Sequence, residues 1–146
     1  MVPHQEQRRY CALVVDNNRD AAAGFAMVLR FAGCEAAFIT DPRDALAEII
    51  RLKPHVAFLN IGMPYLDGFQ LARLLRAEYQ EPLKLIAVTG PGEAQDPAAW
   101  RKAGFDAQVV MPVDPALVQS MIETLLIEGS ASGNPKLPPV GITATA

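Results

Sequence analysis

The sequence has few cysteines and no concentrated basic segment. Its two cysteines, Cys11 and Cys34, form neither a metal-binding spacing nor a disulfide framework. We therefore expect two buried or half-buried thiols in a reducing compartment. The formal net charge is -3, and no run of lysine or arginine stands out beyond Arg8–Arg9. Direct binding to a nucleic-acid backbone is not expected, because it needs a concentrated basic face.

The sequence also lacks long apolar runs. Residues 1–10 do not contain the apolar stretch of a signal peptide, and no run approaches the length of a membrane span. We therefore predict a cytoplasmic protein without a membrane partner. The 146 residues, 51% of them hydrophobic and 20% charged, suffice for one globular domain and a tail.

The composition changes near the carboxyl end of the sequence. Residues 128–146 are rich in Gly, Ser, Pro and Ala, which predicts a flexible tail or linker. We divide the chain into an N-terminal extension at 1–8, a domain at 9–127 and this tail. The tail could be a linker to another domain, a true C-terminus or a binding segment, and the sequence does not separate these alternatives.

Five short apolar runs alternate with segments of helical period. None of the runs alternates with polar residues, which is typical of strands covered on both faces. Helix starts are indicated by Asn18 and by three Asp-Pro pairs, and helix ends by Gly33 and Gly104. The pattern predicts a doubly wound α/β fold, with ligands at the carboxyl ends of the strands. The predicted strands are 12–15, 36–39, 56–59, 85–88 and 107–110.

The residues at these strand ends form a recognisable set of motifs. The most specific piece is Met63–Gly68, within a longer block that begins at Asn60. On these motifs the chain resembles, over about residues 9–127, the receiver domains of bacterial response regulators (the CheY-like family). The resemblance implies a flavodoxin-like sandwich with a five-stranded parallel sheet of order 2-1-3-4-5. The motifs are VVDNNR at 14–19, NIGMPYLDG at 60–68, VTG at 88–90, AGFDA at 103–107 and MPVDP at 111–115.

The resemblance implies a phosphoryl-transfer site, and the sequence departs from that site at most of its positions. In the family, an Asp after the third strand accepts a phosphoryl group, and two acidic residues after the first strand help to hold Mg²⁺. A Thr or Ser, a Lys and a switch aromatic complete the set. Of these, only Asp16 and Thr89 fit here. The corresponding positions are Asn60 (phosphoacceptor), Asp16 and Asn17 (acidic pair), Thr89 and Gln108 (switch) and Met111 (lysine).

These departures change the expected chemistry. A neutral amide at Asn60 is a poor nucleophile, so an acyl phosphate should not form there. Mg²⁺ binding should be weak or absent, although a residual weak site at Asp16 stays open. Met111 can fill the space of a lysine stem without its charge. We predict no catalytic residue, no cofactor and no enzyme activity. Asp16 could equally cap backbone amides, and Asp67 is expected to start a helix.

The function predicted from the resemblance is a phosphorylation-independent protein-interaction module of two-component signalling. Its partner would be a histidine kinase, another regulator, an output domain or a second copy, docked on the face of the fourth helix, fifth strand and fifth helix. Trp100 is either an interface anchor on this face or a residue packed on the domain. Alternatives are a small-molecule sensor that uses the vacated pocket, and a receiver phosphorylated at a non-standard residue. The resemblance also suggests a cis Met111-Pro112 bond. Candidate interface residues are Trp100, Lys102, Gln119 and Glu123.

Overall fold

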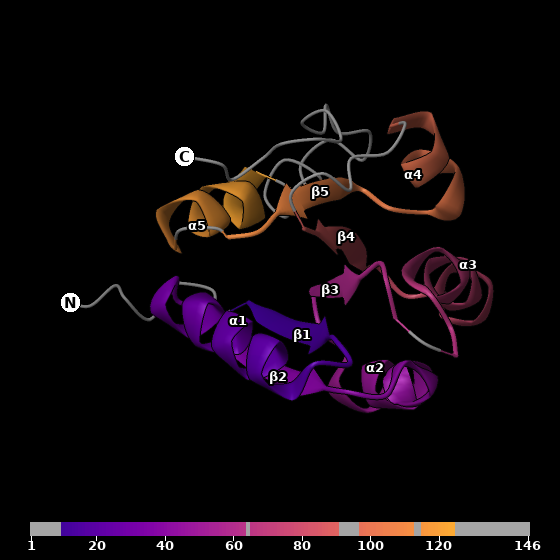
Figure 1. The fold of residues 1–146 in the computed structure, drawn as a ribbon, viewed down its shortest axis with the longest axis horizontal. Coiled ribbons are helices and arrows are strands. Elements are labelled where there is room, and N and C mark those ends of the chain that lie inside the picture. Colours follow the sequence, from indigo (N-terminus) through magenta and orange to yellow (C-terminus); the bar gives the residue numbers. More distant parts are fainter. Residues whose placement is uncertain (1–9, 64, 91–96, 113–114, 125–146) are drawn as a thin grey trace.

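Strands and helices alternate along the chain in the computed structural model, which describes residues 10–63, 65–90, 97–112 and 115–124 (Figure 1). A short 3₁₀ helix, η2 (Pro42–Asp44), precedes α2. The strands are β1 (Cys11–Val15), β2 (Glu35–Ile39), β3 (Val56–Asn60), β4 (Lys84–Thr89) and β5 (Ala107–Val110). The α-helices are α1 (Arg19–Phe31), α2 (Ala45–Leu52), α3 (Gly68–Glu78), α4 (Pro97–Ala103) and α5 (Pro115–Glu123).

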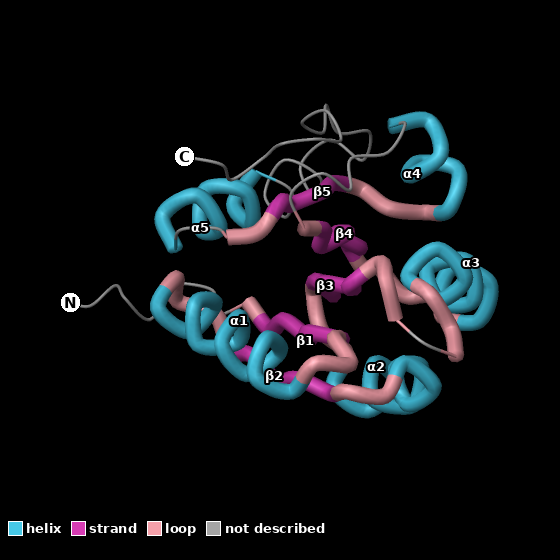
Figure 2. Tube along the Cα trace, viewed as in Figure 1, coloured by secondary structure: helices cyan, strands magenta, loops and turns pink. Residues whose placement is uncertain are grey.

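The five strands form one parallel sheet in the order β2-β1-β3-β4-β5, which confirms the predicted topology. In the register of the sheet, Leu13 lies opposite Ala37 on one side and Ala57 on the other. The tube view shows the strands in the middle layer between two helical layers (Figure 2). Because all strands are parallel, their carboxyl ends meet at one edge of the sheet, where the candidate site residues stand.

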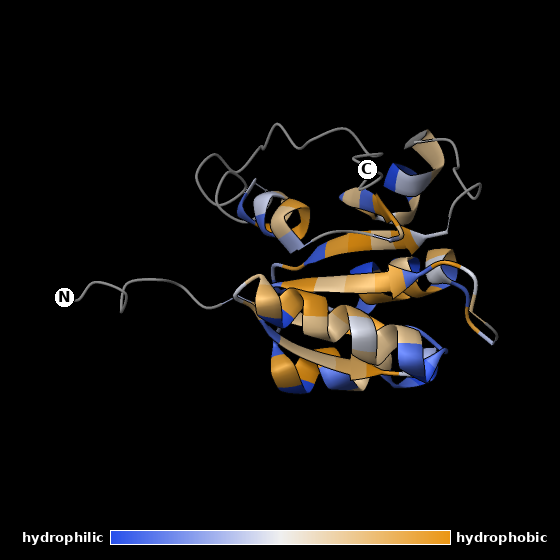
Figure 3. Ribbon diagram, turned by 60° about the vertical axis from the view of Figure 1, so that its left-hand side comes forward, coloured by the Kyte–Doolittle hydropathy of each residue, from blue (hydrophilic) through white to orange (hydrophobic). Residues whose placement is uncertain are grey.

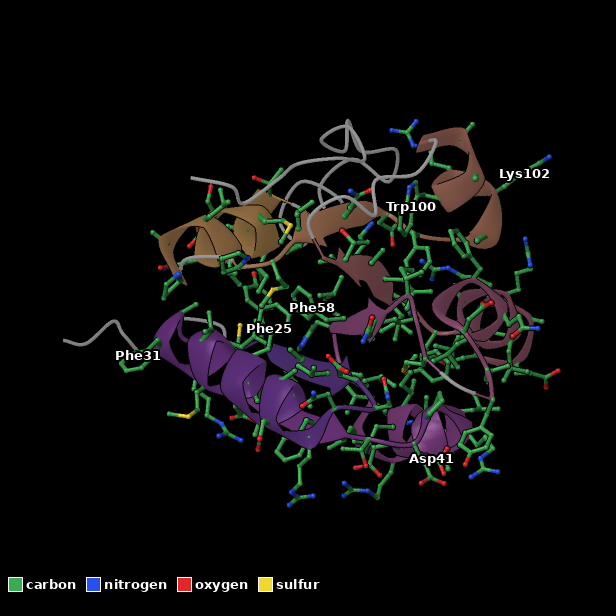
Figure 4. All side chains as sticks on the ribbon, viewed as in Figure 1. Phe25, Phe31, Asp41, Phe58, Trp100 and Lys102 are labelled. Atoms are coloured by element: carbon green, nitrogen blue, oxygen red, sulfur yellow. The ribbon has the colours of Figure 1, made fainter. Side chains whose placement is uncertain are left out.

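Helices cover both faces of the sheet, so the sheet has a hydrophobic core on each side (Figures 1 and 3). On the side of α1 and α5, Phe25 meets the ring of Phe58 edge to face, with 4.9 Å between ring centroids (Figure 4). On the side of α2, α3 and α4, Leu71 and Leu75 are buried against the strands. Burial on both faces explains why the strands read as continuous apolar runs.

The predicted helix signals have the expected geometry where the structure describes them. The Asn18 side chain accepts a hydrogen bond from the Ala21 amide at 3.0 Å, at the start of α1. Gly33 and Gly104 have φ angles of 95° and 111°, a left-handed conformation that favours glycine after a helix. Asp41 caps the 3₁₀ helix η2 by accepting from the Arg43 amide.

Some of the predicted signals lie outside the described residues. These are Asp96 and Asp114, the expected caps of α4 and α5, although both helices begin at the following proline as predicted. The last two leucines of the expected α5 stripe, at 125 and 126, lie outside as well. The extension at 1–8 and the tail at 128–146 are also outside the described residues. Within the described part of the chain, no helix is long and apolar enough to cross a membrane.

Arg76 joins α3 to the amino-terminal ends of β4 and β5, a contact that the sequence did not predict. Its guanidinium donates to the Gly104 carbonyl at 2.8 Å, to the Leu83 carbonyl at 2.7 Å and to Asp106 Oδ2 at 2.8 Å. Asp106 also accepts from the Leu85 amide at 2.8 Å. Both partners are partly buried, so the cluster fixes the helix against the sheet at the edge opposite the candidate site.

Both cysteine thiols are at least half-buried, as the sequence predicts. Cys34 is buried and Cys11 is half-buried, and both are free. Burial raises the pKa of Cys34, with a smaller contribution from Cys11. Burial also raises the pKa of Cys11, with a smaller contribution from the Glu35 charge. The neutral thiol is therefore favoured at both positions.

Candidate functional site

The candidate site is the group of side chains at the carboxyl ends of β1, β3, β4 and β5. Backbone hydrogen bonds hold these ends in register. Asp16 N–H donates to the Ile39 carbonyl at 3.2 Å, and Met111 N–H donates to the Thr89 carbonyl at 2.8 Å. The sheet thereby brings Asp16, Asn60, Thr89 and Met111 to one edge, as the sequence predicts.

A direct hydrogen bond joins the ends of β1 and β3. Asn60 Nδ2 donates to Asp16 Oδ1 at 2.9 Å. The orientation of the amide follows from its other end, because Asn60 Oδ1 accepts from the Gly62 amide at 3.1 Å. Asp16 Oδ1 also accepts from the Asn18 amide at 2.9 Å, so Asp16 does cap backbone at the strand end. Both side-chain termini of Asn60 are thus engaged within the domain.

The β3–α3 loop folds back tightly on the end of β3. Gly68 N–H donates to the Ile61 carbonyl at 2.9 Å. A Cβ atom at Gly68 would lie 2.8 Å from the Asn60 carbonyl oxygen and from Ile61 Cα, so glycine is required by space. Asp67 and Gln70 then form a reciprocal capping box at the start of α3, which confirms the predicted role of Asp67.

A second contact ties this loop to the 3₁₀ helix η2, just before α2. Arg43 stacks over the ring of Tyr65, with 4.1 Å from its guanidinium carbon to the ring centroid. Asp41 holds the same guanidinium through both carboxylate oxygens, at 3.0 and 2.8 Å. Hydrogen bonds from Arg43 lower the pKa of Asp41. Sequence reasoning missed this stack, because no local signal links residues so far apart in the sequence.

The two remaining strand-end positions are engaged with the interior. Thr89 is buried, and its Oγ1 donates to the Val109 carbonyl at 3.4 Å, as in an ordinary strand-end hydroxyl. Met111 is partly buried and packs against the core on the α1 and α5 side. The Met111-Pro112 bond is cis, as predicted. Asn17, by contrast, is exposed to solvent.

The structure corrects the prediction that Trp100 anchors an interface. Trp100 is 0% exposed, and its ring packs on Phe69 and Phe105 at centroid distances of 5.0 and 5.6 Å. The alternative prediction, a residue packed on the domain, is the correct one. The seven-residue α4 carries no large apolar side chain besides Trp100, so no apolar stripe in its sequence indicated which side of the helix faces the sheet.

Other residues of the predicted interface differ in exposure. Gln108 is only 4% exposed, so it cannot present its side chain on the surface of the domain. Lys102, Gln119 and Glu123 are exposed, and Figure 4 shows Lys102 pointing away from the body of the domain. The predicted interface residues that are exposed are therefore polar or charged side chains of α4 and α5.

The donor set at the strand ends is poor in carboxylates. Asp16 supplies one, Asn17 and Asn60 supply amides, and Met111 supplies a thioether. Within the described ranges, no three His, Cys, Asp or Glu side chains are close enough to share a metal ion.

The chain is similar in sequence to known regulators. The family described as "Response regulator receiver domain" matches residues 12–123. The transcriptional regulatory protein PrrA of Mycobacterium tuberculosis is 31% identical over 114 residues, which is 78% of this chain and 48% of that protein. The DNA-binding response regulator MtrA of Mycolicibacterium smegmatis is 30% identical over 103 residues, which is 70% of this chain and 44% of that protein. The chain thus spans about half the length of these relatives.

Solved structures share the fold. The CheY-like receiver domain protein of Methanospirillum hungatei superposes with a TM-score of 0.73 and 24% identity, over 86% of this chain and 100% of that one. A putative response regulator from Chloroflexus aurantiacus gives a TM-score of 0.72 and 24% identity, over 82% of this chain and 99% of that one. With the family match over most of the described residues, the chain belongs to the response regulator receiver domain family.

Proposed function

We propose that this receiver domain acts in two-component signalling as a protein-interaction module that is not switched by phosphorylation. The observation that carries the proposal is the 2.9 Å hydrogen bond from Asn60 Nδ2 to Asp16 Oδ1. It directs an amide N–H group into the space between the two strand ends. A receiver that accepts a phosphoryl group needs a carboxylate oxygen there instead.

The chemistry at Asn60 argues against an acyl phosphate. The neutral amide is a weak nucleophile, and its oxygen is already hydrogen-bonded to the Gly62 amide. Met111 provides no positive charge to meet a phosphoryl oxygen, and its partly buried side chain packs against the core. We therefore assign no catalytic residue and no enzyme activity to this domain.

The same geometry argues against a Mg²⁺ site. Mg²⁺ prefers anionic oxygen ligands in near-octahedral geometry. Asp16 Oδ1 already accepts two hydrogen bonds, from Asn60 and from the Asn18 amide. A cation between Asp16 and Asn60 would meet the amide N–H group of Asn60. The domain should therefore work without a bound metal ion or other cofactor.

The face of α4, β5 and α5 remains the proposed docking surface. Lys102, Gln119 and Glu123 offer exposed polar and charged groups there. The partner would be a histidine kinase, another regulator, an output domain or a second copy. PrrA is named a transcriptional regulatory protein and MtrA a DNA-binding response regulator, so an output of that kind would need a part beyond this domain.

The test is incubation with acetyl phosphate and Mg²⁺, followed by intact-protein mass spectrometry. We expect no phosphoryl adduct on the wild-type chain. A double variant, N60D with M111K, restores the family residues at two positions and serves as the matched positive control. Histidine kinase binding should be equal with and without the phosphodonor. An adduct on the wild-type protein, at Asn60 or elsewhere, would overturn the proposal.

A further inference from the structure

The strand β2 lies at the edge of the sheet and has a strand neighbour on one side only, among the residues described. The Glu35 amide donates to the Tyr10 carbonyl, and the Ile39 carbonyl accepts from the Asp16 amide. Backbone groups alternate along a strand, so those of Ala36 and Phe38 point to the open edge. The strand sequence EAAFI contains neither lysine nor proline, the residues that usually protect an edge.

One side chain of α1 closes part of this edge. Arg30 donates from its guanidinium to the Ala36 carbonyl at 2.7 Å. Beside it, Met27 and Phe31 are 55% and 80% exposed, and Phe31 points away from the domain (Figure 4). With Arg30, these two side chains line an open hollow of about 360 Å³. The open edge is thus continuous with an apolar surface of α1.

We propose that a second copy of this chain pairs here, β2 against β2, in antiparallel orientation about a twofold axis near Ala37. Such a pairing is self-complementary, because the outward groups of Ala36 meet those of Phe38 in the second copy. The two sheets then join into one continuous sheet. This inference concerns a different surface from the docking face of α4, β5 and α5, and it does not depend on the proposed function.

The position of α1 favours β2 of a second copy, rather than a strand of a different protein, as the partner at this edge. The helix packs on both β2 and β1, so its axis lies inward of the edge. Strands pair at about 4.8 Å, which would place the two α1 axes roughly 10 Å apart, within the usual range for packed helices. Adding a Cβ atom to Gly24 meets nothing within 4 Å, so the middle of the helix has room for close approach.

One pair of charges on α1 is complementary in this arrangement. Antiparallel helices place the first turn of one beside the last turn of the other. Asp20 lies in the first turn and Arg30 in the last, and both are exposed. When pairing releases Arg30 from the Ala36 carbonyl, that oxygen accepts from Phe38 N–H of the second copy. The guanidinium then takes Asp20 of the second copy as its partner.

The test is sedimentation velocity of the full chain between about 5 and about 500 µM, where mass action reveals a dimer. We expect a concentration-dependent dimer. Ala36→Pro removes an outward N–H without breaking a bond to β1, and Met27→Glu adds charge to the seam; each should raise the Kd about tenfold or more. Asp20→Arg and Arg30→Asp should each weaken the dimer, and the double exchange should restore it.

Lys102→Glu, an exposed change on α4, is the matched control and should leave this dimer unchanged. Circular dichroism of each variant separates loss of pairing from loss of fold. A chain that stays monomeric throughout the range overturns the inference. So does a dimer that Lys102→Glu abolishes while Ala36→Pro and Met27→Glu leave it intact. Neither result affects the phosphorylation test, which reads the site on a monomer or a dimer alike.

Discussion

Asn60 Nδ2 and Asp16 Oδ1 lie 2.9 Å apart, which places a neutral amide in direct contact with the carboxylate at the end of the neighbouring strand. This contact is made by two side chains, just beyond the last backbone pair of β1 and β3. Two carboxylates at this distance would repel each other, whereas the amide attracts its neighbour. Asn60, in place of the Asp that is typical of the family, therefore alters both the chemistry and the stability of the strand ends.

Replacing Asn60 with Asp should destabilise the domain by about 1–3 kcal/mol near neutral pH, because a hydrogen bond becomes a like-charge contact. The repulsion raises the pKa of the introduced carboxyl group in the folded state. The stability of the variant relative to wild type is therefore highest below about pH 4, and it falls as the pH rises through that raised pKa. Urea denaturation between about pH 4 and pH 7 measures the difference. A variant as stable as wild type at both pH values would contradict this reading.

Two glycine substitutions should act in opposite directions. Gly68→Ala forces a Cβ atom to 2.8 Å from backbone atoms at the end of β3, so it should cost about 2 kcal/mol or more and disturb the amide signals of Asn60. Gly24→Ala lies in the interior of α1 with open space around it, so it should stabilise the domain by about 0.5–1 kcal/mol. Thermal unfolding of both variants gives the comparison, and equal effects would contradict the packing described at Gly68.

The Arg76 cluster should be a main determinant of stability at the other edge of the sheet. Arg76→Ala leaves the partly buried Asp106 carboxylate without its cation and should cost about 2–4 kcal/mol. Asp106→Asn keeps an acceptor for the Leu85 amide and should cost about 1 kcal/mol. Arg73→Ala, an exposed change on the same helix, is the control. Denaturation followed by the fluorescence of the buried Trp100 should give this order.

The structure predicts both the order and the pH dependence of thiol reactivity. Burial raises the pKa of Cys11 and Cys34, so both should react slowly with a thiol reagent at neutral pH, the half-buried Cys11 first. Because folding favours the protonated thiols, this contribution to stability is present below about pH 8.5 and falls as the pH rises through the raised pKa values. The alkylation rate of each cysteine, measured in native buffer and compared with its rate in urea, checks the prediction. Cys34 reacting at the unfolded rate would contradict it.

Local signals accounted for much of the fold and for the location of the site. Asn18, Gly33 and Asp67 each act through hydrogen bonds or a φ angle set within a few residues, so the sequence predicts their roles. The carboxyl ends of the strands meet at one edge because all five strands are parallel. The resemblance placed Asn60 and Asp16 together at this edge, and the structure brings them into contact.

Contacts between distant segments were not predictable in this way. Arg76 meets Asp106 and Arg43 meets Tyr65 only because the fold brings separate loops and helices together. The sequence allowed two orientations of Trp100, exposed at an interface or packed on the domain. Its contact with Phe69 on α3 shows that the second is correct. Side-chain pairing across the fold depends on tertiary geometry that a pattern along one segment does not carry.

The most direct test of the central claim is a ¹⁵N NMR titration with Mg²⁺ and then beryllofluoride, a mimic of the aspartyl phosphate. If the Asn60–Asp16 contact replaces the phosphoryl-transfer site, the amide signals of Asp16, Asn60, Thr89 and Met111 should stay unchanged through both additions. The double variant N60D with M111K should respond under the same conditions. Shifts in the wild-type chain that begin at these residues and spread to β5 and α5 would show that the site still binds and switches, and would contradict the account.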